Sequence, residues 1–583
     1  MSRVSEFCLQ GTSVMRSILS RWLMAATVAG SALVLAQPAA PHAMPASAYI
    51  VQSHGAQSAV RIVTGVGGRI THDLPIIHGV SAMLTPAQAT RLRQLGTVDL
   101  FADSSVRTQW GSTWSGMARS PVTTQRQSTS SGDAVRNDAV RNGVVPNQDA
   151  RVEIGADRLG AQGFDGSGVT VAVLDTGVAS SWIQAIQNTG YSKQLVTYSA
   201  DGSRFEDYSG HGSHVATIIG NPVRSINGQP LGLAPMVTVI AVKAFDGNGS
   251  STYASVLSGL NWIFNNRATY NIRVLNLSFA AKPQSFYWND PIDQAVMSLW
   301  QAGVVVVASA GNWGPKAQTI GVPGNVPYII TVGAMTDNYT PANPLNYRLT
   351  SFSSTGPTFE GFVKPEILAP GGHIIGTMDG NTALIAQQHP AFQLHIDNLY
   401  IMSGTSQAAA VVSGAVALML QADPSLTPDT VKCRLMSSAR PAVDTQGQLA
   451  YSVFQQGAGE INVYDAVYSQ STGCANAGLN IASDLAGTAH FGGPARQAAD
   501  GSYYVVDQNG SPINQQGYLW NNGYLWNSGY LWNSGYLWNN GYLWNSGYLW
   551  NNGYLWNNGY LWNASFTPSA ASASAINMWV NQE

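Results

Sequence analysis

The chain has 583 residues, of which 45% are hydrophobic and 10% are charged, and its formal net charge is −3. A chain of this length and hydrophobic content can bury a sizeable core and form more than one domain. The weak negative charge gives no electrostatic basis for binding nucleic acid, so we expect no nucleic-acid partner.

The N-terminus has the pattern of a secretory signal. Arg16 and Arg21 precede an apolar run from Leu23 to Ala36, and a stretch rich in Pro and Ala follows it. A membrane anchor is the alternative, but the run is shorter than the about 20 apolar residues that cross a bilayer. We therefore assign residues 1–40 to a signal region and expect a secreted or extracellular protein with no membrane span in its mature form.

Residues 41–106 are predicted to form a small α+β domain. Strand-like runs at 48–63 and 76–106 enclose one helix, expected from Pro86 to Leu95. Residues 107–150 are rich in Ser, Thr, Gln and Arg and show no apolar periodicity. This composition indicates an exposed linker, the kind of segment that proteases cut.

From residue 151 to about residue 470, buried apolar strands alternate with helices. The expected strands cover residues 169–175, 237–243, 272–278, 303–311 and 328–334. This pattern predicts an α/β domain with a mostly parallel sheet and helices on both faces. Functional groups gather beyond the carboxyl ends of such strands, which here are Asp175, Lys243, Ser278 and Asn312.

Asp175 ends an entirely apolar strand, where a carboxylate is costly unless a partner satisfies its charge. A histidine is the natural partner, and the alternative is a structural aspartate that caps the turn "DTG". The stretch "SGHGSHVATIIG" from Ser209 offers two histidines. It lacks the Glu of HExxH and a third ligand, so we expect no metal site there. His214 leads into an apolar run and is expected to be structural, which leaves His211, flanked by Gly210 and Gly212, as the working residue.

Ser406 lies at the start of a helix of small and apolar residues, after Gly404 and Thr405. Free amides at a helix N-terminus can stabilise a developing negative charge, although a helix-capping serine is the simpler reading of this position alone. A serine nucleophile needs a base, and the base needs a third group to orient it. Asp175, His211 and Ser406 supply these three roles.

In this order along the chain, the three residues resemble the catalytic triad of the subtilisin-like serine peptidases. The blocks "SAGN" at 309–312, "FSSTGP" at 352–357 and "KPEILAPGG" at 364–372 follow in family order, and the resemblance covers roughly residues 152–468. It implies a serine endopeptidase that acts on proteins or peptides and needs no cofactor for its chemistry. Ser406 would be the nucleophile, His211 the general base, Asp175 its orienting partner and Asn312 the side-chain donor of the oxyanion hole.

The resemblance also implies further features. The small domain resembles an inhibitory propeptide, so the protein would be a self-processed zymogen whose propeptide is one of its own partners. Substrate would bind along Ser278-Phe279-Ala280 and Gly247-Asn248-Gly249, with Ser278, Ala280 and Gly311 as substrate-binding candidates. Phe279, Ala280 and Gln407 depart from the family pattern, so side-chain preference is not carried over. The loop at 221–235 lies where relatives bind structural calcium, and its sequence leaves occupancy open.

The C-terminal region contains eight copies of a hexapeptide, "GYLWNN" or a close variant, within residues 517–564. Tyr and Trp are two residues apart, so a strand would place both rings on one face. A small β-solenoid and a low-complexity tail are both compatible with the pattern, and the repeats are expected to bind a glycan or a cell surface, or to act as a passive spacer. We assign residues 471–516 to a linker and 565–583 to a tail.

Cys433 and Cys474 remain after Cys8 leaves with the signal region. In an oxidising compartment they would form one disulfide, and the alternative is two unrelated thiols. For the whole protein, the alternative to a peptidase is a surface-binding protein in which a subtilisin-like domain is an inactive scaffold.

Overall fold

The computed structural model describes residues 45–54, 58–103, 147–188, 195–200, 202–224, 228–341, 344–394, 398–443, 449–507, 510–513 and 573–574. The expected signal region, most of the 107–150 linker and the hexapeptide repeats lie outside the described residues.

Residues 47–102 form an antiparallel four-stranded sheet in the order β2-β3-β1-β4, with two helices. Its elements are β1 (Ser47–Ser53), α1 (Ala59–Gly65), β2 (Arg69–Leu74), η1 (Pro75–Ile77), β3 (Gly79–Leu84), α2 (Pro86–Leu95) and β4 (Val98–Ala102). The helix predicted at Pro86–Leu95 is confirmed. The strand-like prediction is wrong for α1, because the Ser58 side chain accepts a hydrogen bond from Arg61 N and starts a helix that buries Ala59, Ile62 and Val63.

The central sheet has the strand order β12-β11-β10-β8-β5-β7-β6, and β13 pairs with β11. All of these pairs are parallel except the pair of β12 with β11. The strands are β5 (Thr170–Asp175), β6 (Leu195–Ser199), β7 (Thr238–Lys243), β8 (Ile272–Leu277), β10 (Val305–Ser309), β11 (Ile330–Thr336), β12 (Arg348–Leu349) and β13 (Ile367–Pro370). The five strands predicted from apolar runs are therefore confirmed in a mostly parallel sheet.

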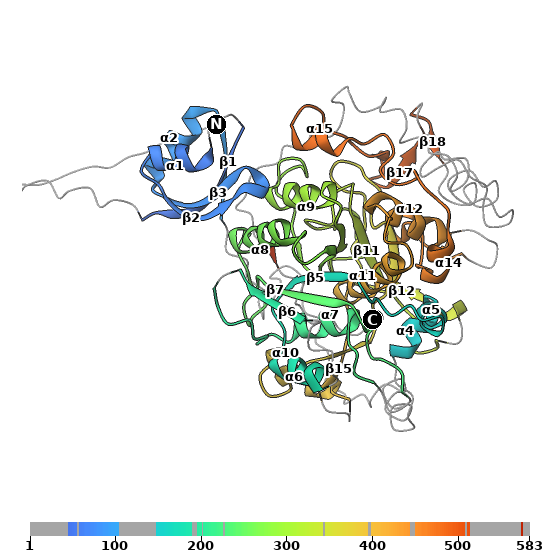
Figure 1. The fold of residues 1–583 in the computed structure, drawn as a ribbon. Helices are drawn as coiled ribbons and strands as arrows, with labels where there is room; N and C mark the ends of the chain where they lie inside the picture. Colours follow the sequence, from blue (N-terminus) through green and yellow to red (C-terminus); the bar gives the residue numbers. More distant parts are fainter. Residues whose placement is uncertain are drawn as a thin grey trace, which may run out of the picture. The chain divides into compact units, whose positions relative to one another are not determined.

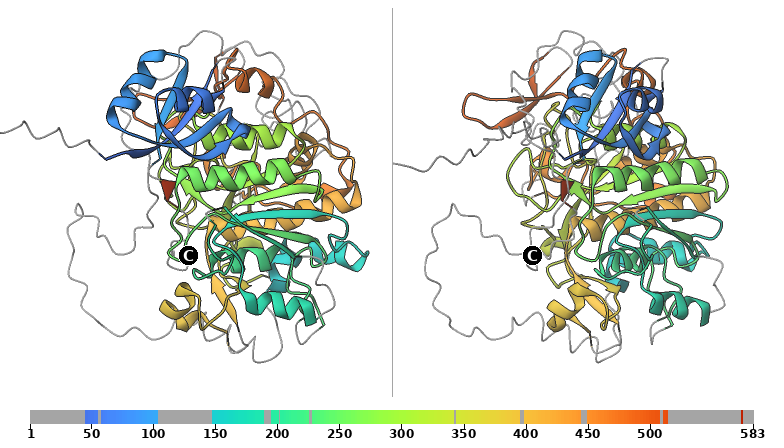
Figure 2. Two further views of the ribbon diagram at one scale, coloured as in Figure 1. Left: turned by 60° about the vertical axis from the view of Figure 1, so that its left-hand side comes forward. Right: turned by 90° about the vertical axis from the view of Figure 1, so that its left-hand side faces the viewer.

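Helices cover both faces of this sheet. Figures 1 and 2 show α8 (Tyr253–Asn266) and α9 (Pro291–Gln301) on one face and α7 (His211–Ile219) on the other. Helix α11 (Thr405–Ala422) packs against α7 and against β8, β10 and β11. Among the described residues, α11 alone is long and apolar enough to span a membrane, and 89% of its apolar window is buried, as in a core helix.

Shorter elements complete the described part of the domain. They are α4 (Asn147–Glu153), α5 (Ala156–Ala161), α6 (Ser180–Asn188), β9 (Ala280–Ala281), η3 (Pro344–Asn346), β14 (Ile374–Thr377), α10 (Leu384–Gln388), η4 (Pro390–Phe392), β15 (Leu399–Met402), α12 (Pro428–Ser438), α13 (Val453–Gln456) and α14 (Val463–Tyr468). Strands β14 and β15 form an antiparallel two-stranded sheet, and β9 pairs with β19 (Ala573–Ser574).

The segment expected to be a linker at 471–516 differs from that expectation. It contains α15 (Ile481–Leu485) and a three-stranded sheet of β16 (Ala495–Gln497), β17 (Tyr503–Val506) and β18 (Pro512–Ile513). The hydroxyls of Tyr287 and Tyr328 both donate to the Asp484 carboxylate, at 2.8 and 2.5 Å. Apolar side chains also attach the segment, because Ala495 and Val505 are buried in the main hydrophobic core and Phe491 packs against it. These residues follow no regular helix or strand period in the sequence.

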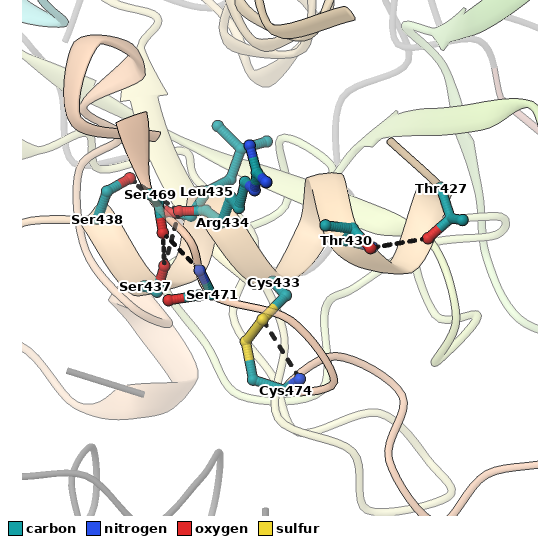
Figure 3. Close-up of a disulfide and its surroundings, with 10 residues drawn as sticks. All are labelled: Thr427, Thr430, Cys433, Arg434, Leu435, Ser437, Ser438, Ser469, Ser471 and Cys474. Atoms are coloured by element: carbon teal, nitrogen blue, oxygen red, sulfur yellow. Dashed lines mark hydrogen bonds between the residues drawn. A yellow bond between two sulfur atoms is a disulfide. The ribbon is translucent and has the colours of Figure 1, made fainter. Parts of the chain in front are cut away.

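Figure 3 shows Cys433 of α12 joined to Cys474 by a disulfide. Both residues are buried, and their Cα atoms lie 5.2 Å apart, within the usual range for a disulfide. The bridge attaches the start of the 474–507 segment to the helical layer of the domain.

Candidate active site

The polar residues at the ends of the central strands lie on one edge of the sheet. Asp175 ends β5, Ser278 directly follows β8, and Asn312 lies three residues after β10. Because β5, β8 and β10 are parallel neighbours, their carboxyl ends meet at the same edge. Lys243 ends β7 beside them, but its Nζ donates to the Glu206 carbonyl at 2.7 Å and so stabilises a loop.

Asp175 and His211 form a buried pair. Asp175 Oδ1 lies 2.8 Å from His211 Nδ1, and the two side chains are 4% and 2% exposed. The same carboxylate oxygen accepts the Thr176 backbone N–H at 2.8 Å. A carboxylate only accepts, so Nδ1 carries the proton, and Nε2 of the neutral ring is left as the basic nitrogen.

Asp207 holds the start of α7, and the sequence analysis missed it. Its carboxylate accepts the backbone N–H groups of Ser209, Gly210 and Ser213 at 3.0, 2.8 and 2.7 Å, and the Thr176 hydroxyl at 2.8 Å. Burial raises the pKa of Asp207, and these hydrogen bonds oppose the shift. Asp207 lies three residues before the N-cap of α7, Gly210, so the usual capping pattern in the sequence does not reveal this role.

The glycines around His211 serve backbone packing. A Cβ on Gly212 would collide with the Gly177 carbonyl, and Gly210 has φ of +97° with Met378 Sδ 2.6 Å from where a Cβ would lie. These glycines bring the loop after β5 and the segment after β14 against the start of α7, rather than opening space beside the histidine ring. They therefore fix the position of the histidine relative to Asp175.

His214 has the structural role expected for it. Its Nε2 lies 3.1 Å from the Tyr400 carbonyl, so Nε2 carries the proton, and Nδ1 accepts from Gln407 Nε2 at 3.4 Å. Desolvation lowers the pKa of His214 to about 3. The neutral ring thereby links α7 to β15 and to the first turn of α11. Gln407 departs from the family pattern, and its hydrogen bond to His214 explains why a polar residue lies at this buried position.

Ser406 is the second residue of α11. Its hydroxyl donates to the Ser278 carbonyl at 3.1 Å, and the Ser278 hydroxyl donates back to the Ser406 carbonyl at 2.9 Å. Beneath them, Asn276 Nδ2 donates to Ser278 Oγ at 2.8 Å, and Asn276 Oδ1 accepts from Ser413 Oγ at 2.9 Å. Asn276, another residue that the sequence analysis missed, is fully buried, and a polar residue within the apolar run "IRVLNLS" was its signal.

The Asn312 side chain is oriented by the residue before Ser406. Its Oδ1 accepts the Thr405 backbone N–H at 3.0 Å and the Thr405 hydroxyl at 2.9 Å. The amide nitrogen is therefore on the opposite side, available as a donor beside the N-terminus of α11. A Cβ on Gly404 would lie 3.4 Å from Asn312 Nδ2 and 2.6 Å from Gln407 Oε1, so a glycine keeps this space open.

The substrate-binding candidates lie around this centre. Gly311 has φ of +114°, which favours glycine, and its N–H donates to Thr405 Oγ1 at 3.3 Å. Phe279 is buried against Phe245, with ring centroids 5.2 Å apart, so its side chain belongs to the core. The segment 247–249 forms a turn in which Asp246 Oδ1 accepts the N–H groups of Asn248 and Ser250. The two proposed peptide-binding segments therefore differ. Residues 278–280 run into strand β9 (Ala280–Ala281), whereas residues 247–249 form a turn.

Comparison with known proteins identifies the class of this site. Residues 166–459 match the model of the Subtilase family, and the chain belongs to that family of subtilisin-like serine peptidases. It is 35% identical to Serine protease AprX of Bacillus subtilis (strain 168) over 317 residues, 53% of this chain and 68% of that protein. It is 33% identical to Subtilisin DY of Bacillus licheniformis over 314 residues, 53% of this chain and 94% of that protein.

A solved structure supports the fold. Fervidolysin from Fervidobacterium pennivorans, described as a keratinolytic enzyme related to subtilisin, aligns with a TM-score of 0.52 and 21% sequence identity. The alignment covers 73% of this chain and 61% of that chain.

The chemistry of the family needs no cofactor, and calcium binding is common among its members. Among the described residues, no group of three or more His, Cys, Asp and Glu side chains could hold a metal ion. Residues 225–227 of the loop at 221–235 lie outside the described part.

Proposed function

We propose that this protein is a secreted serine endopeptidase that hydrolyses peptide bonds in proteins, with Asp175, His211 and Ser406 as its catalytic triad. The observation that carries the proposal is the buried hydrogen bond of 2.8 Å between Asp175 Oδ1 and His211 Nδ1. This bond fixes the histidine tautomer that a general base requires. His211 is the first residue of α7, and α7 packs against α11, the helix that carries Ser406. An inactive scaffold would not need this arrangement.

In the proposed mechanism, His211 Nε2 takes the proton of the Ser406 hydroxyl as Ser406 Oγ attacks the peptide carbonyl. The resulting oxyanion accepts hydrogen bonds from Asn312 Nδ2 and from the Ser406 backbone N–H. His211 then gives its proton to the leaving amine, and water hydrolyses the acyl-enzyme by the same steps in reverse roles. Asp175 stabilises the imidazolium that forms in each half of the reaction.

The bonds of the nucleophile support this assignment. The Ser406 backbone is tied through Ser278 and Asn276 to Ser413 of the same helix, and the Asn312 amide is tied to Thr405. These bonds hold both oxyanion donors before substrate arrives, which is the condition for electrostatic stabilisation of a transition state.

We further propose that residues 41–106 act as an inhibitory propeptide that is removed by cleavage in the linker 107–150. Contacts with the helical face of the domain support this. Gln52 Nε2 donates to Gln294 Oε1 at 2.6 Å, and Ser298 Oγ donates to the Ile76 carbonyl at 3.3 Å. Asp103 Oδ1 accepts the Ala254 N–H at 3.0 Å, so a carboxylate lies at the positive N-terminal end of α8.

The repeats at 517–564 are proposed to attach the enzyme to a glycan or a cell surface. Their paired Tyr and Trp residues without charges suit stacking on sugar rings or contact with apolar surfaces.

Hydrolysis of casein by the purified wild-type protein and by the Ser406→Ala variant tests the enzymatic proposal. We expect the wild type to degrade casein. The variant should lose essentially all of this activity while its circular dichroism spectrum remains that of a folded protein. Absence of hydrolysis by a folded wild-type protein that has lost residues 1–150 would favour the inactive scaffold instead.

A further inference from the structure

Strand β9 has two edges, one paired with the domain at Val322 and the other beside Ser406. Ala281 exchanges two backbone hydrogen bonds with Val322, at 2.9 and 2.8 Å, and the Phe279 carbonyl accepts from Ser309 Oγ at 3.1 Å. Backbone groups of successive residues in a strand point to opposite sides. The N–H and C=O of Ala280 therefore point to the other edge, which also carries the Ser278 carbonyl that accepts from Ser406 Oγ.

The C-terminal segment of the same chain lies on this edge. Strand β19 pairs with β9 in antiparallel register, with Ser574 opposite Ala280 and Ala573 opposite Ala281. It is the short dark-red arrow in Figure 2. The chain direction matters, because an antiparallel strand that passes from Ala281 to Ala280 continues toward Ser278 and hence toward Ser406.

We propose that strand β19 (Ala573–Ser574) is an intramolecular ligand of the substrate-binding edge and competes with substrate for it. This rests on the proposed function, since it assigns the edge beside Ser406 to substrate. Addition of an extended strand to a sheet edge uses main-chain hydrogen bonds, which any sequence can supply. The described ladder is two residue pairs long. Such a short ladder binds weakly, so the tether to the domain has to supply the effective concentration.

The expected size of the competition follows from that tether. A ligand within the same chain can reach an effective concentration on the order of 1 mM. A free peptide with a dissociation constant of about 0.1 mM, within the usual range for protease substrates, would then be weakened roughly tenfold by the attached segment.

The test uses four chains that all carry Ser406→Ala, so that no chain cleaves itself. A site for an added sequence-specific protease, placed within residues 107–150, allows the proposed propeptide to be removed from each folded chain before binding is measured. They are the full chain, a chain that ends at Asn563, the full chain with Ser574→Pro and the full chain with Ala573→Pro. The probe is a fluorescein-labelled peptide with the sequence of residues 570–580, and binding is measured by fluorescence anisotropy. Proline at 574 removes the N–H that faces the Ala280 carbonyl, whereas the nitrogen of residue 573 points away from β9 in this register.

We expect the truncated chain and Ser574→Pro to bind the peptide about tenfold more tightly than the full chain, and Ala573→Pro to bind like the full chain. Equal affinity in all four chains, or no binding by any of them, would overturn the proposal and leave the linker at 107–150 as the candidate occupant of the edge. If the two proline variants changed the affinity for the peptide equally, the pairing of Ser574 with Ala280 would be wrong, and with it the proposal.

The same four tail sequences with Ser406 restored separate this proposal from the proposed function. If the binding differences are as expected but none of these chains hydrolyses casein, the edge is occupied by the tail and the peptidase assignment fails. If all of them hydrolyse casein and the binding differences are absent, the peptidase assignment stands and the tail proposal fails.

Discussion

His214 should make the folded protein sensitive to acid, whatever the role of His211. Its ring is fully buried, donates from Nε2 to the Tyr400 carbonyl, and accepts at Nδ1 from Gln407. A Cβ on Gly376 would lie 2.6 Å from its Cγ, so β14 packs closely against the ring. Desolvation is the main cause that lowers the pKa of His214 to about 3, and His211 nearby lowers it further.

The sign of the effect follows from proton linkage. An unfolded histidine has a pKa of about 6.5, so between about pH 6.5 and pH 3 the unfolded chain binds a proton that the folded protein excludes. The stabilisation is fully present above about pH 6.5 and is lost as the pH falls, by about 1.4 kcal/mol per pH unit. At pH 6.5 half of the unfolded chains already carry this proton, so between pH 6.5 and pH 4.5 the free energy of unfolding should fall by roughly 2 kcal/mol from this group alone.

The assay compares His214→Gln with its parent, both carrying Ser406→Ala to prevent autolysis. Glutamine retains a donor for the Tyr400 carbonyl but does not titrate. We expect the variant to be less stable at pH 7.5, and the urea midpoint of the parent to fall more steeply between pH 6.5 and pH 4.5 than that of the variant. Parallel pH profiles of the two midpoints would refute the reasoning, because they would show that another group carries the acid sensitivity.

The remaining predictions concern the proposed function. Asn312→Ala should lower turnover by about 100- to 1000-fold, the effect known for loss of the corresponding donor in subtilisin, with little change in KM; a raised KM at unchanged turnover would count against the oxyanion role. Wild-type protein purified from secreting cells should lack the residues before a cut within 107–149, whereas Ser406→Ala should retain residues 41–106, and identical N-termini by intact-mass spectrometry would assign the trimming to another protease. Deletion of residues 517–563 should weaken attachment to cells or glycans while hydrolysis of a short soluble peptide stays unchanged, and loss of that hydrolysis would place the repeats within the catalytic fold.

The sequence predicted the sheet well because its strands are buried on both faces. A run such as "VTVAVLD" is apolar at every position before its final aspartate except Thr170, and β5 is buried throughout. The same reasoning located Asp175, Ser278 and Asn312, since a polar residue directly after such a run lies at a strand end. The pairing of Asp175 with His211 then needed only the chemistry of the two side chains.

Features that depend on contacts between distant segments could not be predicted in this way. Asp484 holds the 474–507 segment through tyrosines almost 200 and more than 150 residues away, and the segment has no periodic pattern of its own. Strand β19 lies in a stretch of Ser and Ala that resembles a featureless tail. Asp207 positions His211, and Asn276 positions Ser406. Of these two, only Asn276 has a signal in the sequence, since it is a polar residue in an apolar run.

The identity of the nucleophile is the central claim, and covalent labelling tests it most directly. A serine-directed fluorophosphonate forms a stable adduct only with a serine that a neighbouring base activates. Mature wild-type protein should take up one label per chain, and tandem mass spectrometry should locate that label on Ser406. A label on any other residue, or the absence of a label from protein that degrades casein, would contradict the assignment of the triad.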